Sequence, residues 1–164
     1  MSVDPAFLGR HEIATSDAME NLGLRIGEQL QAGDLIVLTG PLGAGKTTFT
    51  RGLAEWLGVR GPVQSPTFVI ARTHPSLVEG PPLVHVDAYR LGSAAELDDL
   101  DIDFARSVVV IEWGRPMASA VADSWWDIEL ERPVGGADVA DEDLDADAPR
   151  LVTIECISRS SAAD

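Results

Sequence analysis

Basic side chains are scarce in this sequence of 164 residues, which carries 12 Lys and Arg against 27 Asp and Glu and has a formal charge of −15. Proteins that bind nucleic acid gain much of their affinity by placing Lys and Arg against phosphates. The acidic excess therefore predicts no extensive nucleic-acid contact by this chain. If it serves RNA or DNA, we expect partner proteins to make the contact.

Cysteine and long apolar runs are also scarce. Cys156 is the only cysteine, so no disulfide can form within the chain. The longest aliphatic runs, 35–38 and 108–111, are far shorter than the roughly 20 apolar residues that span a bilayer. The first residues, Met-Ser-Val-Asp-Pro, include neither the basic nor the apolar region of a secretory signal. We therefore expect a cytoplasmic protein.

The apolar content is nevertheless high enough for a buried core, since hydrophobic residues make up 45% of the chain. At this length we expect a single domain over residues 1–164. Six acidic residues and no basic one fall in the Gly- and Ala-rich stretch 135–149. That composition predicts a solvated, flexible loop, and a docking element for a basic partner is the alternative.

The hydrophobic pattern predicts alternating helices and strands. We expect helices over 16–31 and 46–57, with shorter helical patches near 93–105 and 116–122. Strands are predicted at 35–38, 67–71, 83–87, 107–112, 125–131 and 150–157. The early succession of strand, turn and helix favours an α/β sheet with helices on its faces. Parallel and mixed pairings of these strands are both compatible with the pattern.

Residues 40–47 read Gly-Pro-Leu-Gly-Ala-Gly-Lys-Thr and match the phosphate-binding loop G-x-x-x-x-G-K-[ST], between a predicted strand and a predicted helix. Glycines let the backbone curl, so that successive N–H groups meet phosphate oxygens at the positive end of the helix. Lys46 is expected to reach the β- and γ-phosphates, and the Thr47 hydroxyl to complete a Mg²⁺ shell. Lys46 is also the only lysine, which excludes the guanine-specificity motif N-K-x-D. A standard GTPase is therefore not expected.

Two acidic residues, Asp87 and Glu112, each follow an apolar run that reads as a strand. Strands of α/β folds deliver such side chains to the edge where ligands bind, so either carboxylate could be the acid on the magnesium side. Ser65 and Thr67 belong to a hydroxyl-rich turn that could contact a γ-phosphate. His85 is expected on a strand face with its polar atoms satisfied.

Taken in order, four motifs resemble the TsaE family of bacterial P-loop ATPases. They are the loop at 40–49, Ser-Pro-Thr-Phe at 65–68, His-Val-Asp-Ala-Tyr-Arg-Leu at 85–91 and Glu-Trp at 112–113. The resemblance covers about residues 10–131. It implies a P-loop NTPase-like three-layer sandwich, with a mostly parallel sheet, helices on both faces and antiparallel strands late in the chain.

The same resemblance implies an ATPase with ATP and Mg²⁺ as cofactors. Such a protein binds the TsaD and TsaB proteins and supports threonylcarbamoylation of adenosine 37 in tRNAs that read codons starting with A, without transferring the group itself. Because no arginine finger is evident in the sequence, we expect slow hydrolysis without partners. A small-molecule kinase in which Asp87 deprotonates a substrate hydroxyl, and a non-catalytic nucleotide-binding adaptor, are the alternatives.

The resemblance also implies roles for particular residues. Lys46 and Asp87 would be catalytic, with Asp87 near the γ-phosphate, and Thr47 and Glu112 would bind Mg²⁺. The residues implied to contact the nucleotide are Thr15, Ser16, Gly40, Pro41, Leu42, Gly43, Ala44, Gly45, Lys46, Thr47, Thr48, Ser65, Thr67 and Arg150.

Overall fold

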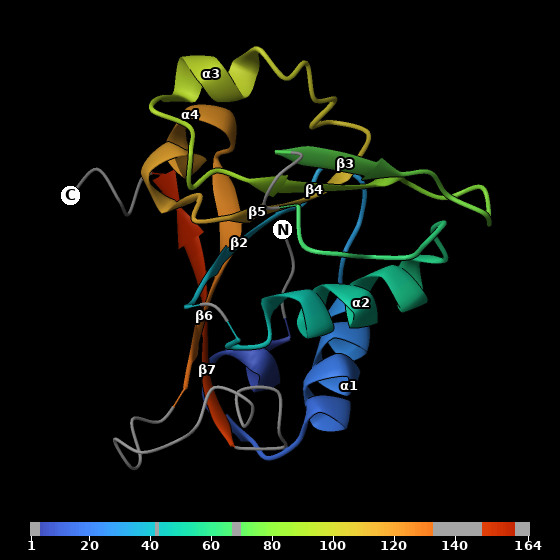
Figure 1. The fold of residues 1–164 in the computed structure, drawn as a ribbon, viewed down its shortest axis with the longest axis vertical. Helices are drawn as coiled ribbons and strands as arrows, with labels where there is room; N and C mark the ends of the chain where they lie inside the picture. Colours follow the sequence, from blue (N-terminus) through green and yellow to red (C-terminus); the bar gives the residue numbers. More distant parts are fainter. Residues whose placement is uncertain (1–3, 42, 67–69, 133–148, 160–164) are drawn as a thin grey trace.

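A seven-stranded sheet runs through the computed structural model, which describes residues 4–41, 43–66, 70–132 and 149–159 (Figure 1). The strand order is β1-β7-β6-β2-β5-β4-β3. The strands are β1 (Gly9–Ile13), β2 (Leu35–Thr39), β3 (Ala71–His74), β4 (Leu83–Asp87), β5 (Val108–Glu112), β6 (Ser124–Glu131) and β7 (Arg150–Ser158). The central strands β6, β2, β5 and β4 are parallel, whereas β1, β7 and β3 pair antiparallel.

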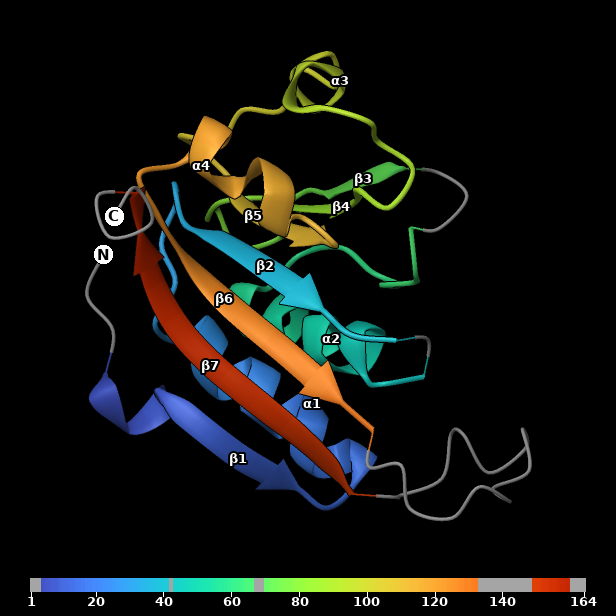
Figure 2. The same ribbon diagram turned by 90° about the vertical axis from the view of Figure 1, so that its left-hand side faces the viewer.

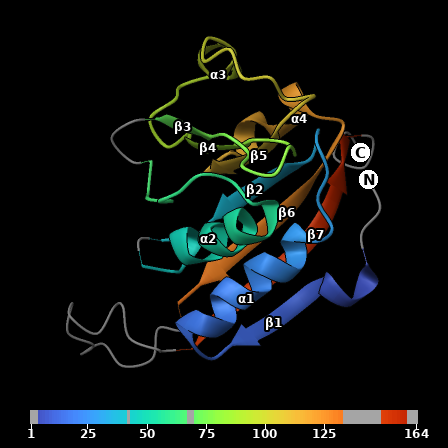
Figure 3. The ribbon, with the colours of Figure 1, turned by 90° about the vertical axis from the view of Figure 1, so that its right-hand side faces the viewer.

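Two helices, α1 (Ser16–Gly27) and α2 (Lys46–Leu57), lie side by side on one face of the sheet (Figure 3). Their apolar sides, which include Ile26, Phe49 and Leu53, are fully buried against strand residues of the same face. The helices approach closely where a Cβ atom on Gly52 would lie 2.0 Å from the backbone oxygen of Glu20. Glycine at this position lets the two backbones come together, and α1 thereby fixes the position of α2.

Short helices cover the other face of the sheet (Figure 2). They are α3 (Ala94–Asp98), η2 (Arg115–Met117) and α4 (Ala118–Val121), while a further turn, η1 (Pro5–Phe7), precedes β1. Leu97 and Met117 pack there against strand residues such as Val37 and Val109. In β2, alternate side chains thus enter the two separate cores, which is the pattern of a strand buried on both faces.

The expected three-layer α/β sandwich with a parallel core is confirmed, and the fold is P-loop NTPase-like. Three predicted elements had the wrong boundaries: the helix at 16–31, the strand at 67–71 and the helical patch near 93–105. Helix 16–31 ends at Gly27, because Gln29 and Leu30 donate to carbonyls three residues back, and the buried Leu30 only prolongs the apolar period. In the predicted strand 67–71, residues 67–69 lie outside the described residues.

The last two residues of that predicted strand show where β3 begins. Ile70 has a left-handed φ of 73°, which a strand residue does not adopt, so β3 starts at Ala71.

Within the predicted helical patch near 93–105, only the five residues of α3 form an α-helix. β1 was not predicted, since Gly9–Ile13 at the sheet edge lacks an alternating apolar pattern. No helix in the described part of the chain is long and apolar enough to cross a membrane.

Candidate nucleotide-binding site

The predicted phosphate-binding loop lies where β2 ends and α2 begins, at the carboxyl edge of the parallel strands (Figure 2). Open α/β sheets bind ligands at this edge. α1 begins at the same end of the molecule, since its Met19 side chain would be 3.1 Å from a Cβ atom on Gly45. Two helix N-termini therefore point toward one edge of the sheet.

The backbone of the loop has the shape that the glycines predict. Gly45 has a φ of 109°, a left-handed conformation that side chains rarely permit, and it serves as the N-cap of α2. A Cβ atom on Gly40 would lie 2.7 Å from the Leu130 carbonyl oxygen. Because glycine provides no capping side chain, the first amides of α2 are left to other acceptors. Pro41, the buried Ala44 and the half-buried Thr47 and Thr48 complete the described part of this loop and the first turn of α2.

The ammonium group of Lys46 lies between the loop and the end of β5. Its Nζ atom donates to the Gly40 carbonyl oxygen at 2.6 Å and lies 3.6 Å from Oε1 of Glu112. It also lies 4.6 Å from the centre of the Trp113 ring. A carbonyl, a carboxylate and an aromatic face thus hold the cation at the mouth of the loop.

The two acidic residues singled out in the sequence are opposite each other in neighbouring strands. Asp87 at the end of β4 is in register with Glu112 at the end of β5. Both are buried, with exposed fractions of 7% and 4%. The Oδ1 atom of Asp87 accepts a hydrogen bond from the Tyr89 amide at 3.0 Å. The structure therefore brings both carboxylates and Lys46 to one edge, although their roles stay predictions.

His85 lies on a strand face, as expected, but the expectation that its polar atoms are satisfied was wrong, because in the described part of the chain its buried Nδ1 atom has no hydrogen-bond partner. The partner of its other ring nitrogen belongs to the site. The ring is fully buried, and Nε2 lies 2.6 Å from Oε2 of Glu112. Strand alternation places His85 on the same face as Asp87, two residues on, so the sequence contained a signal for this position. The identity of its partner depends on the pairing of β4 with β5, which the sequence left open.

Trp113 leaves β5 in a left-handed conformation, with a φ of 63°. Its amide donates to the Leu38 carbonyl at 2.8 Å, and its ring meets that of Tyr89 edge-on, at 5.8 Å between centroids. Left-handed backbone is costly for a bulky residue and is typical of functional sites. The turn places the indole beside Lys46.

Arg150, at the start of β7, reaches the loop across the sheet. Its Nη2 atom donates to the Gly43 carbonyl at 3.0 Å. Burial and the neighbouring Arg132 lower the pKa of its guanidinium below the usual value. In β1, Ile13 pairs with Arg150, so the exposed Thr15 and Ser16 follow close by, and Thr15 caps α1 by accepting from the Ala18 amide.

The remaining predicted site residues fall in less regular parts of the chain. Ser65 is exposed in the segment that follows α2, whose described part runs back along α2 (Figure 1). Leu42 and Thr67 lie outside the described residues, as does the acidic stretch except for its last residue, Pro149. Their predicted roles have no structural counterpart here.

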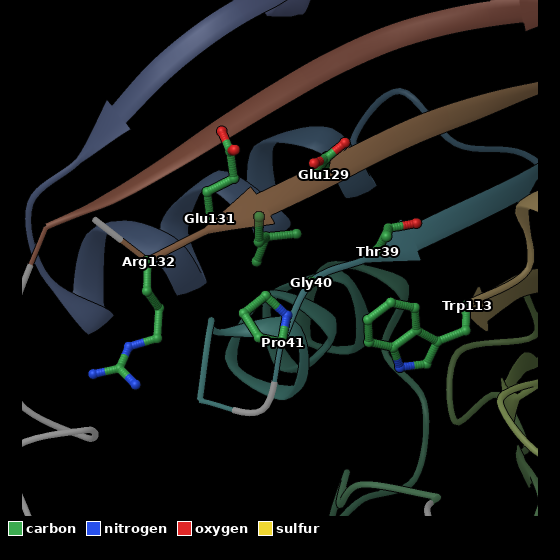
Figure 4. A pocket seen from close by; sticks show the side chains of 8 residues that line it. Thr39, Gly40, Pro41, Trp113, Glu129, Glu131 and Arg132 are labelled. Carbon is green, nitrogen blue, oxygen red and sulfur yellow. The ribbon is translucent and has the colours of Figure 1, made fainter. Parts of the chain in front are cut away.

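A hollow of about 340 Å³ adjoins the loop, and the sequence patterns did not reveal it. Trp113 and Arg132 lie at its opposite ends, with Pro41 between them (Figure 4). Glu129 and Glu131 project along the neighbouring strand, and Arg115 donates to Glu129 at 2.8 Å. The hollow offers an aromatic wall, carboxylates and a guanidinium beside the loop. It is lined by Thr39, Gly40, Pro41, Trp113, Glu129, Leu130, Glu131 and Arg132.

Comparison with known proteins gives concordant results. The family model described as threonylcarbamoyl adenosine biosynthesis protein TsaE matches residues 13–136. A curated relative from Streptomyces coelicolor, called tRNA threonylcarbamoyladenosine biosynthesis protein TsaE, is 57% identical over 127 residues, or 76% of this chain and 84% of that protein. The protein of the same name from Mycobacterium leprae is 52% identical over 120 residues, or 68% and 74%.

A solved structure supports the same assignment at the level of the fold. The crystal structure of Bacillus subtilis YdiB superimposes with a TM-score of 0.64 and 27% identity, covering 93% of this chain and 86% of YdiB. The predicted phosphate-binding loop, the two carboxylates at the strand ends and these relatives all indicate the same family. The chain therefore belongs to the TsaE family, whose members serve the biosynthesis of threonylcarbamoyladenosine in tRNA.

Proposed function

We propose that the protein is a magnesium-dependent ATPase that binds the TsaD–TsaB pair and supports threonylcarbamoylation of adenosine 37 in tRNAs that read codons starting with A. The observation that carries the ATPase proposal is the ion pair of Lys46 with Glu112 beside the loop between β2 and α2, with Asp87 in register with Glu112 on the next strand. Phosphoryl transfer depends mainly on positioning and charge stabilisation, and this set supplies both.

The loop would bind the phosphates of ATP through backbone amides and Lys46. The ammonium is held now by the Gly40 carbonyl and the Glu112 carboxylate, groups with which a phosphate oxygen would compete. Arg150 would act on the loop rather than on the nucleotide directly, because its guanidinium donates to the Gly43 carbonyl. Thr15, Ser16 and the hollow beside Trp113 would lie toward the nucleoside.

The residues present fit a bound Mg²⁺. The described part of the chain has no group of three or more His, Cys, Asp or Glu side chains that could hold a metal ion alone. Mg²⁺ in nucleotide enzymes needs no such group, because one or two protein oxygens, substrate phosphates and water complete its shell. Glu112 and Thr47 would hold it, and the ion would neutralise charge on the phosphates.

Asp87 would orient the water that attacks the γ-phosphate. Its carboxylate is buried and fixed by the Tyr89 amide. The water oxygen would form the new bond to phosphorus and give its proton to the Asp87 carboxylate, while the bond from phosphorus to the oxygen bridging the β- and γ-phosphates breaks, and ADP and inorganic phosphate leave. A carboxylate in this role contributes about 10²- to 10⁴-fold in rate.

Partner proteins would make the contact with tRNA and raise the rate of ATP hydrolysis. The formal charge of −15 opposes direct binding to a polyanion. The test is to measure phosphate release with and without purified TsaD–TsaB. We expect slow turnover alone and faster turnover with the pair. Full ATPase activity without TsaD–TsaB would refute activation by that pair. Failure of the protein to co-purify with TsaD–TsaB would refute the proposed binding.

Variants separate the proposed roles. Lys46→Ala is expected to weaken nucleotide binding, whereas Asp87→Asn is expected to bind ATP but hydrolyse it about 100-fold more slowly. Asp98→Asn, an exposed acid of α3, is the control and should resemble the wild type. A phosphorylated metabolite in place of free phosphate would indicate a kinase, and tRNA modification unaffected by Asp87→Asn would indicate a non-catalytic adaptor.

A further inference from the structure

We propose that His85 is a positioning residue for Glu112, and that it holds this carboxylate in the orientation in which it serves a divalent cation. The inference rests on the proposed function, since it concerns the proposed magnesium ligand. It gives a role to a buried histidine that takes no part in the proposed hydrolysis itself.

The geometry ties the two side chains together in the interior of the sheet. His85 has no exposed surface, and its Nε2 atom lies 2.6 Å from Oε2 of Glu112. The other carboxylate oxygen, Oε1, lies 3.6 Å from Nζ of Lys46. The two oxygens of Glu112 thus face different partners, one in the interior and one at the loop.

The direction of the hydrogen bond follows from the surroundings of the ring. In the described part of the chain, the buried Nδ1 atom of His85 has no hydrogen-bond partner. An N–H without an acceptor in that place would be costly. A carboxylate oxygen accepts a proton donor at this distance, so the ring proton belongs on Nε2 and is donated to Glu112.

The backbone makes this contact a fixed part of the site. His85 pairs with Val110 and Asp87 with Glu112, on adjacent parallel strands. The imidazole therefore reaches Glu112 from a position set by the sheet, and not from a loop. Groups that fix a metal-binding side chain from behind affect metal affinity about 10- to 100-fold when they are replaced.

Two substitutions distinguish positioning from packing. His85→Gln places an amide nitrogen near the position of Nε2 and can still donate to Glu112. His85→Asn has a shorter side chain, whose amide falls near the position of Nδ1. The control is His74→Gln, because His74 is another buried histidine of the same sheet, and its Nδ1 atom lies 2.8 Å from the Arg60 carbonyl oxygen, away from Glu112.

The measurement is the affinity for a nonhydrolysable ATP analogue, determined by calorimetry once with Mg²⁺ and once with EDTA. The dissociation constant in EDTA divided by the dissociation constant with Mg²⁺ reports the contribution of the metal. We expect His85→Asn to reduce this ratio about 10-fold and to leave the affinity in EDTA unchanged. His85→Gln should stay within about threefold of the wild type, and His74→Gln should match it.

A ratio for His85→Asn equal to that of the wild type would overturn the inference, as would equal losses for the Gln and Asn variants. If the wild type itself shows no effect of Mg²⁺, the proposed function fails first. Should both variants unfold, ¹⁵N NMR of the wild-type protein still decides the matter. A proton on Nε2 of His85 supports the contact, and a proton on Nδ1 instead overturns it.

Discussion

Gly52→Ala is predicted to destabilise the protein, although alanine is the better helix former. In an exposed helix this change would gain about 1 kcal/mol. Here the added Cβ would lie 2.0 Å from the Glu20 carbonyl oxygen and 2.7 Å from the Leu24 amide nitrogen. Both atoms belong to the backbone of α1, so no side-chain rotation relieves the contact, and the helices must separate.

The expected size follows from comparing the two effects. Overpacking of a well-packed core costs about 1–3 kcal/mol, and a backbone contact this close belongs at the upper end of that range. After the gain in propensity, we expect a net loss of about 2 kcal/mol. For a chain of 164 residues this lowers Tm by about 4–8 °C.

The assay is urea unfolding followed by circular dichroism, with Glu55→Ala, an exposed position on α2, as the control. Glu55→Ala should change the free energy of unfolding by less than about 0.5 kcal/mol. Nucleotide affinity should also fall in Gly52→Ala, because α1 positions the helix that begins at the loop. An unchanged or increased stability in Gly52→Ala would refute the close contact between the two helices.

Three further predictions concern other parts of the molecule. Arg150→Met removes the donor to the Gly43 carbonyl, and calorimetry should show about 10-fold weaker ATP binding; undiminished affinity would speak against a role in shaping the loop. Arg115→Ala leaves the buried carboxylate of Asp127 without its 2.7 Å partner, so urea unfolding should show a loss of about 1–3 kcal/mol in the free energy of unfolding. An unchanged free energy of unfolding would refute a stabilising role for this ion pair. Burial raises the pKa of Asp34 above its ordinary value of 3.8, so ionisation opposes folding. Asp34→Asn should therefore become more stable relative to the wild type as the pH rises above about 4, and a gain confined to lower pH would contradict this sign.

Much of the site could be predicted because its signals are local in the sequence. The loop at 40–47 needs glycines where the backbone bends, and these stand between an apolar strand and an amphipathic helix. The strand ends Asp87 and Glu112 could be located from the apolar runs before them. The structure places Glu112 3.6 Å from Nζ of Lys46, and Asp87 lies in register with Glu112 on the neighbouring parallel strand.

The contacts that could not be predicted join distant parts of the chain. Arg150 and Gly43 are 107 residues apart, and their contact depends on β7 crossing to the loop. The bond between His85 and Glu112 depends on which strands are neighbours and on their register. A sequence pattern alone specifies neither.

Edge positions were also difficult to predict. β1 pairs with β7 through backbone hydrogen bonds and exposes most of its side chains, so it shows little apolar alternation.

The left-handed conformation of Trp113 is held by the surrounding structure, through the Leu38 carbonyl and the Tyr89 ring. No local preference of tryptophan predicts it.

The most direct test of the proposed site is a crystal structure of the protein with Mg²⁺ and a nonhydrolysable ATP analogue. We predict that the β- and γ-phosphates lie in the loop at 40–47, with Nζ of Lys46 moved from the Gly40 carbonyl to phosphate oxygens. Glu112 should face the metal while Oε2 keeps its contact with His85. Phosphates bound elsewhere on the molecule, with Lys46 still on the Gly40 carbonyl, would contradict the proposed site.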